Sequence, residues 1–193
     1  AYPDRSGEVA FWAGLAQPCG PRLLDLMCGT AEVSLGLDRA GFQVLGVDRS
    51  PAMLAVGAGR LATAAADPPA PGLRLVQGDV RTIPTGDAHF DFALLGGNGS
   101  FNHLGRSEAA MALREVARVL RPGGGLGMEL VNPFLLQEIP AERTFGALRS
   151  TPPGVQIETR VSNHYDQDAG LFHIRQVTEV ERGGSRTAFQ ESF

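Results

Sequence analysis

The feature that most constrains the fold is a regular alternation of short apolar runs with helical stretches over residues 1–131. Short apolar runs are typical of strands buried on both faces, whereas an apolar residue at every third or fourth position is typical of helices. Strands that alternate with helices indicate βαβ units, right-handed crossovers and a mainly parallel sheet. The expected strands are 22–27, 42–47, 73–77, 90–95 and 126–131.

Helices are expected at 8–17, at 31–40, from Ser50 onward and at 107–120. Ser50 and Ser107 are the candidate N-caps, and a Pro follows Ser50 at the first helical position. The segment 121–124 (RPGG) is expected to end the last helix. The charged side chains of that helix are expected on its solvated face; they are Glu108, Arg114, Glu115 and Arg118.

The pattern changes after Asn132. Three expected strands, at 155–165, 171–181 and 186–193, follow one another with turns and no helix between them, which predicts an antiparallel meander. The predicted fold class is α/β, a three-layer, Rossmann-like, mostly parallel sheet with an antiparallel strand extension at the C-terminal end. The length of 193 residues suits a single domain, with a core at 1–131 and an extension at 132–193 that we expect to be truncated.

Composition excludes several classes of function. The net charge of -4 offers no general attraction to nucleic acid or to an anionic membrane, and no apolar run reaches the ~20 residues of a membrane span. Two cysteines are too few for a disulfide framework or a zinc site, so we expect a cytoplasmic protein without a metal. The expected partner is a small molecule, and the expected state is a monomer or a homodimer.

Acidic residues stand at the ends of the first three expected strands, where ligands bind in an open parallel sheet. Asp48 follows Gly29 by 19 residues, the spacing at which a carboxylate accepts hydrogen bonds from ribose hydroxyls. Asp79 is placed to accept from an exocyclic amine such as that of adenine, and the backbone after it suits the ring nitrogens. Asp25 precedes a tight turn that directs a helix N-terminus at the ligand.

Five segments carry a resemblance to a known family: LLDLMCGTAEVSLGL, GVDRSPAML, LVQGDVRTIP, FDFALLGGNGSFNHL and EVARVLRPGGGLGMEL. In this order and at this spacing they resemble the motifs of the class I S-adenosylmethionine (SAM)-dependent methyltransferases. The chain is most similar to bacterial small-molecule enzymes with an antiparallel insertion after the fifth strand. The resemblance implies SAM as cofactor and S-adenosylhomocysteine (SAH) as product.

The resemblance also implies the cofactor-binding residues. The first strand and its loop would hold the methionine part of SAM, Asp48 the ribose, and Asp79 with the following backbone the adenine. Tyr2 stands where many relatives have a tyrosine that closes over the cofactor. The complete expected set is Asp25, Met27, Cys28, Gly29, Thr30, Asp48, Arg49, Met53, Asp79, Val80, Gly96, Gly97 and Asn98.

The chain departs from the family pattern in the loop after the first strand. The usual Gly-x-Gly-x-Gly becomes Met27, Gly29 and Ala31. Ala31 is expected to be a mild change, because the helix there need only pack closely. A methionine with positive φ would be strained, so an extended φ is expected at Met27. The last two strands of the family are not found in the sequence.

Methyl transfer depends more on the alignment of the acceptor with the methyl group than on acid–base chemistry. A general base is needed only where the nucleophile is protonated when it binds. His103 is the candidate base and Asn98 the candidate orienting group; the alternative for His103 is an ordinary loop histidine. The side chains of His164, Tyr165, His173 and Arg175 either line an acceptor pocket or face solvent. Cys28 has no neighbour in sequence that would activate it, so its side chain is expected to serve in packing.

The predicted function is methyl transfer to a nitrogen or oxygen of a small-molecule acceptor. A nicotinamide-dependent oxidoreductase shares the glycines and the later acid, but the Gly-x-Gly-x-x-Gly spacing is missing. Two alternatives stay open: a non-catalytic module that binds SAM or SAH, and a methyltransferase for protein or nucleic acid.

Overall fold

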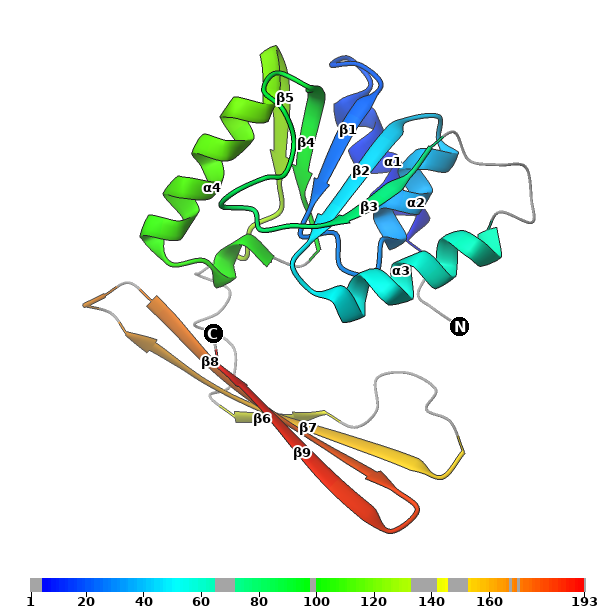
Figure 1. The fold of residues 1–193 in the computed structure, drawn as a ribbon. Helices are drawn as coiled ribbons and strands as arrows, with labels where there is room; N and C mark the ends of the chain where they lie inside the picture. The colour runs from blue at the N-terminus through cyan, green and yellow to red at the C-terminus, as the bar shows by residue number, and fades with distance from the viewer. Residues whose placement is uncertain are drawn as a thin grey trace. The chain divides into compact units, whose positions relative to one another are not determined.

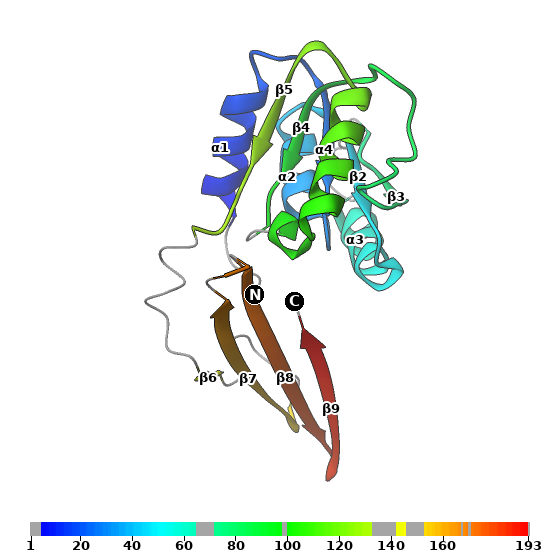
Figure 2. The same ribbon diagram turned by 90° about the vertical axis from the view of Figure 1, so that its left-hand side faces the viewer.

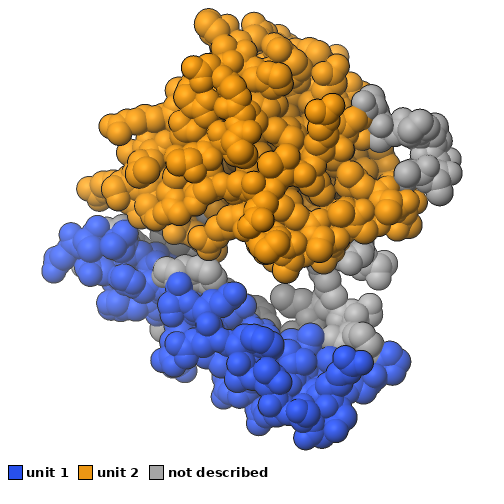
Figure 3. All heavy atoms as spheres, viewed as in Figure 1, with its two compact units in different colours: residues 1–3, 132–193 blue, residues 4–131 orange. Residues whose placement is uncertain are grey.

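The structure is a computed structural model that describes residues 5–64, 72–97, 100–132, 142–145, 153–166, 168–169 and 171–192. The chain divides into two compact units, one of residues 4–131 and one of residues 132–193 with 1–3, coloured separately in Figure 3. That the two act as a single domain stays a prediction.

The larger unit is built on a five-stranded parallel sheet with the order β3-β2-β1-β4-β5 (Figure 1). Its strands are β1 (Arg22–Leu26), β2 (Gln43–Asp48), β3 (Arg74–Gln77), β4 (Phe90–Leu95) and β5 (Leu120–Met128). Its helices are α1 (Ser6–Ala16), α2 (Glu32–Arg39), α3 (Pro51–Ala64), the short 3-10 helix η1 (Ser100–His103) and α4 (Arg106–Val119). The strand order reverses between β1 and β4, as the βαβ pattern of the sequence predicts.

Helices cover both faces of this sheet, which confirms the three-layer arrangement. Figure 2 shows α1 and α4 on opposite sides. Neighbouring residues of β1 point to opposite faces, so Leu23 joins the core beneath α1 and α2 while Leu24 joins the core beneath α4. Helix α3 shares the face of α2, because Leu75 of β3 lies close to Gly57 of α3 and also to Gly46 of β2, on the side of Gly46 that Ser34 of α2 covers. All six residues of β4 are buried, as expected for a central strand.

Two boundaries differ from the sequence prediction. Strand β5 begins at Leu120 instead of residue 126, because Leu120 pairs with Phe90 before a register shift brings Gly125 opposite Phe92. The Pro-Gly-rich segment therefore forms an irregularity within the strand. Helix α4 begins at Arg106, and Ser107 is not its cap; the N–H of Gly105 instead donates to the Glu108 carboxylate at 3.0 Å.

The smaller unit contains an antiparallel sheet with the order β6-β7-β8-β9. Strands β7 (Val155–Asp166), β8 (Leu171–Arg182) and β9 (Ser185–Ser192) confirm the predicted meander. Strand β6 (Glu142–Phe145) was not predicted, because four residues are too few to show an alternating pattern. Gly183 and Gly184 join β8 to β9 with φ of 57° and 79°, the positive values that a tight two-residue hairpin requires.

No helix within the described ranges is long and apolar enough to cross a membrane.

Candidate functional site

A cavity of about 300 Å³ lies where β1, β2 and β3 end, at the edge of the sheet where an open parallel sheet binds ligands. Its walls come from the segments that follow these three strands and from the segment that leads into α4. Its volume falls at the lower end of the range for small-molecule sites. The lining residues are Met27, Gly29, Val47, Asp48, Arg49, Ser50, Met53, Gly78, Asp79, Val80, Arg81, His103, Leu104 and Glu108.

The structure brings many of the sequence-predicted residues together in this cavity. Those that line it are Met27, Gly29, Asp48, Arg49, Met53, Asp79, Val80 and His103. Five others are described but are not among the lining residues: Asp25, Cys28, Thr30, Gly96 and Gly97. Asn98 and Tyr2 lie outside the described residues.

The loop after β1 has a backbone that the sequence prediction described wrongly. Met27 has φ of 57°, Gly29 of 55° and Ala31 of 58°, so every second residue is left-handed. The extended φ expected at Met27 is therefore wrong, and Ala31 is not a mild change. A non-glycine residue in this region costs about 1–2 kcal/mol. The loop is held by N–H donation from Cys28 to the Val47 carbonyl at 3.1 Å and from Ala31 to the Cys28 carbonyl at 3.0 Å.

Asp48 ties two loops together beneath the cavity. Its Oδ2 accepts the N–H of Gly29 at 2.7 Å, and its Oδ1 accepts the N–H of Ser50 at 2.8 Å. A carboxylate has about four acceptor positions, two on each oxygen. Each oxygen of Asp48 therefore keeps one position for a ligand, which matches a pair of vicinal hydroxyls.

Asp79 is engaged more fully, by Arg81. Its Oδ1 accepts the backbone N–H of Arg81 at 2.8 Å and the Nε–H at 2.9 Å, while its Oδ2 accepts from Nη2 at 2.5 Å. These bonds outweigh partial burial and lower the pKa of Asp79 to about 2. The carboxylate is thus ionised at neutral pH and keeps a single acceptor position, on Oδ2.

Arg81 also donates through Nη1 to Glu108, so the segment after β3 is joined to the first turn of α4. The placement of Glu108 on a purely solvated face is therefore wrong. It is wrong also for Glu115, which accepts the Ile83 N–H at 2.9 Å, and for Arg118, which donates to the Ile83 carbonyl at 3.0 Å. These side chains meet the loop between β3 and β4, which passes over α4.

Asp25, the acid of β1, is buried, unlike Asp48 and Asp79. Asp25 is 4% exposed and accepts a hydrogen bond from the Ser34 hydroxyl. Burial raises its pKa to about 7, and the charges of Glu8 and Asp48 act in the same direction. Burial likewise raises the pKa of the Cys28 thiol far above its usual value, so this cysteine is not a nucleophile.

His103 lies in the segment that carries Glu108, which reaches Arg81 and through it Asp79. The sequence analysis did not identify Arg81 and Glu108 as site residues. The spacing of Asp79 and Arg81 could have indicated Arg81, because an arginine two residues after an acid at the end of a strand can form a bidentate pair with that acid.

The chemistry of the cavity suits a nucleoside. It offers one carboxylate with a free position on each oxygen, another with a single free position, and apolar side chains from Val47, Val80 and Leu104. A ribose diol, an exocyclic amine and an aromatic base have the complementary groups. Among the described residues, no cluster of three or more His, Cys, Asp or Glu could hold a metal ion.

Comparison with known proteins agrees with this geometry. The family profile described as "Methyltransferase domain" matches residues 23–124. YqeM of Bacillus subtilis is 30% identical over 135 residues, which are 69% of this chain and 52% of YqeM. The demethylmenaquinone methyltransferase of Staphylococcus carnosus is 34% identical over 108 residues, 54% of this chain and 41% of that protein. The chain thus spans about half the length of these curated relatives.

A solved structure also resembles this chain over most of its length. It is SAM-bound CalS10, an amino pentose methyltransferase from Micromonospora echinaspora involved in calicheamicin biosynthesis. It superposes with a TM-score of 0.67 at 26% identity, over 98% of this chain and 74% of that chain.

Proposed function

This chain belongs to the family of class I SAM-dependent methyltransferase domains, and from that premise we propose that it transfers a methyl group from SAM to a nitrogen or oxygen of a small-molecule acceptor. The observation that carries the proposal is the pairing of Asp48 and Asp79 in one cavity. Asp48 has the two acceptor positions that a ribose diol requires, and Asp79 has the single position that an amine requires.

In the proposed complex, the residues of this chain bind and orient the cofactor. Asp48 accepts from the ribose hydroxyls, Asp79 accepts from the adenine amine, and Val47, Val80 and Leu104 exclude water from the base. When bound, SAM supplies a methyl group that its sulfonium already activates. Catalysis by alignment of this kind supplies about 7–11 kcal/mol, so a general base need not dominate.

His103 remains part of the proposed site, but its proposed role changes from general base to binding of the adenine. It lines the same cavity as Asp79 and Val80, the residues assigned to adenine. This placement favours a role in binding the base over proton transfer at the methyl group. Gly96 and Gly97 follow β4, and we keep them as the residues beside the methionine part of SAM.

The acceptor class is proposed from the named relatives. The 26% identity to CalS10 over 98% of this chain favours an amino sugar as the first acceptor to test. The demethylmenaquinone methyltransferase matches a shorter part, 54% of the chain, and supports a quinol as the second. The two classes are separated by incubating the protein with SAM and each acceptor and measuring released SAH.

The cofactor half is tested by a thermal-shift titration with SAH and with NAD⁺ as control. A ligand at 100 times its dissociation constant stabilises by about 2.7 kcal/mol, or about 5–10 °C for a chain of this size. We expect a shift with SAH alone. A shift with NAD⁺ alone, or with neither ligand, would contradict the proposal.

A second candidate is a module that binds SAM or SAH without turnover. It is favoured by the strained Met27 and Ala31 in the loop that would meet the methionine part. SAH binding without SAH release from SAM over a broad acceptor panel would support it. A nucleic-acid acceptor is less favoured, because the net charge of -4 offers no general attraction to nucleic acid.

A further inference from the structure

The ion-paired chain Asp79–Arg81–Glu108 goes beyond what cofactor binding alone requires. Arg81 joins the acid after β3 to the first turn of α4, and all three residues line the cavity. We infer that Arg81, held by Glu108, is a positioning residue that makes the cavity specific for a 6-aminopurine over a 6-oxopurine. The inference rests on the proposed binding of a SAM-type nucleoside.

Arg81 and Asp79 form a bidentate arginine–carboxylate pair. Nε–H and Nη2 of Arg81 contact different oxygens of Asp79, at 2.9 and 2.5 Å, and the Arg81 backbone N–H adds a third bond at 2.8 Å. A planar, bidentate guanidinium fixes the plane of a carboxylate, which a lysine ammonium does not. The side chain of Asp79 therefore has little freedom to rotate.

The bidentate pair with Arg81 also determines which ligand groups Asp79 can bind. Three of its four acceptor positions are occupied, and the remaining one lies on Oδ2. An ionised carboxylate has no proton to donate, so it accepts from the 6-amino group of adenine. It repels the 6-oxo group of hypoxanthine, because two acceptors then face one another. Arg81 holds this acceptor in one orientation.

Glu108 completes the arrangement from the other side. One of its oxygens accepts from Arg81 Nη1, and the other accepts the N–H of Gly105 at 3.0 Å. The guanidinium is thus anchored to the start of α4 and not to Asp79 alone. The side chains of Asp79, Arg81 and Glu108 are 31%, 35% and 39% exposed, so solvent screens each pair and the effect should be moderate.

The test compares two ligands that differ at one position of the base, SAH and S-inosylhomocysteine, by isothermal titration calorimetry. Wild type should bind SAH about tenfold or more tightly than the inosyl analogue, the usual consequence of one charge-assisted hydrogen bond. Arg81→Met keeps the apolar stem and removes the fork. It should weaken SAH about fivefold and leave the analogue nearly unchanged, so that a tenfold preference falls to about twofold.

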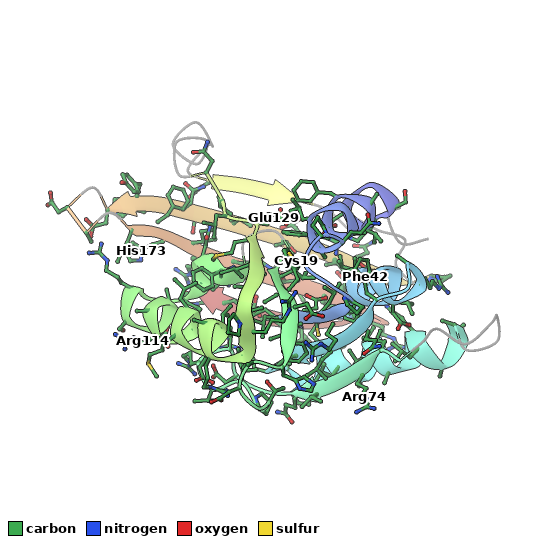
Figure 4. The ribbon with its side chains drawn as sticks, turned by 90° about the horizontal axis from the view of Figure 1, so that it is seen from above. Cys19, Phe42, Arg74, Arg114, Glu129 and His173 are labelled. Atoms are coloured by element: carbon green, nitrogen blue, oxygen red, sulfur yellow. The ribbon has the colours of Figure 1, made fainter. Side chains whose placement is uncertain are left out.

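Two further variants make the test decisive. Glu108→Gln removes only the anchor and should lower the preference part of the way. Arg114→Gln is the matched control, because Arg114 lies exposed on the outer side of the same helix (Figure 4), outside the lining of the cavity, and should leave both affinities unchanged.

Three results would overturn the inference. One is a wild-type protein that binds both ligands equally; another is an unaltered preference in Arg81→Met. The third is a parallel loss of both ligands in Arg81→Met and Glu108→Gln, which would indicate a purely structural role. If wild type binds neither SAH nor S-inosylhomocysteine, the result contradicts the proposed function itself, and the inference with it. This outcome differs from the three above, in which the wild-type protein still binds SAH.

Discussion

Replacing Asp25 by asparagine should stabilise the larger unit at neutral and alkaline pH. Asp25 is 4% exposed, and its neighbours include the negative side chains of Glu8 and Asp48 as well as the positive Arg5. Burial, the largest effect, raises its pKa to about 7, whereas an aspartate in an unfolded chain titrates near pH ~3.9. Asparagine has nearly the same shape, remains neutral at every pH and can still accept from the Ser34 hydroxyl.

The sign follows from proton binding. Between about pH 4 and pH 7 the folded protein keeps a proton on Asp25 that the unfolded chain has lost, so the free energy of unfolding decreases as pH rises. A tenfold difference in proton affinity corresponds to about 1.4 kcal/mol, so the roughly thousandfold difference between the folded and unfolded chain amounts to roughly 4 kcal/mol by pH 8. We expect Asp25→Asn to exceed wild type by about 2–4 kcal/mol at pH 8 and by about 1 kcal/mol at pH 5.

Urea unfolding followed by tryptophan fluorescence measures this difference. Trp12 is the only tryptophan in the sequence and is 3% exposed in the core beneath α1, so it reports on the larger unit. Asp168→Asn, at an exposed turn of the smaller unit, is the control and should change neither value. The reasoning is refuted if Asp25→Asn is no more stable than wild type at pH 8, or if its advantage fails to shrink at pH 5.

Three other predictions test different parts of the larger unit. Asp48→Asn should weaken SAH in calorimetry about tenfold more than it weakens a 2′,3′-dideoxy analogue, because an amide has a single acceptor oxygen, whereas the loss of one loop contact affects both ligands alike; equal losses for both ligands would remove Asp48 from ribose binding. Met27→Val should lower the free energy of unfolding by about 1–2 kcal/mol more than Met27→Leu, since a β-branched residue fits a φ of 57° poorly; urea unfolding that ranks the two alike would contradict this. Asp91→Ala should cost about 2–3 kcal/mol in the same assay, because the Arg22 N–H and the half-exposed guanidinium groups of Arg22 and Arg121 would lose their shared, buried carboxylate. Those arginines hold the pKa of Asp91 far below its usual value, so its contribution is present above about pH 4 and is lost as pH falls further; a stability of the Asp91→Ala variant within about 1 kcal/mol of wild type would refute this.

Most of the fold was predictable because its signals are local. Strands β1 to β4 are short apolar runs bounded by turns, and helix α3 carries its own cap, since the Ser50 hydroxyl accepts the Met53 N–H at 3.3 Å. The start of β5 was missed because the sequence RPGG lacks β propensity. Its place in the sheet is set by pairing with Phe90 and Phe92, a contact between residues distant along the chain. Strand β6 depends likewise on its partner β7.

The candidate site was predictable only where a residue type suffices to define a role. Asp48 ends β2, and Asp79 and Val80 follow β3, so their place in a cavity at this edge of the sheet follows from topology. The role of Glu108 depends on a contact with Arg81, which stands in the loop between β3 and β4, and a contact between residues distant along the chain leaves no periodic pattern in the sequence. The φ of Met27 was missed for a related reason, because residue preference argued against a conformation that the surrounding hydrogen bonds impose.

The two acids at the ends of β2 and β3 show how a fold differentiates identical side chains. Asp48 is met by two backbone N–H groups, one on each oxygen, and keeps a free position on both. Asp79 is met by an arginine that occupies three positions and leaves one. The donors that surround each carboxylate therefore decide what it can still accept, a diol in one case and a single amine proton in the other. Ligand selectivity at this edge of the sheet thus depends on Arg81 and on the backbone as much as on the acids themselves.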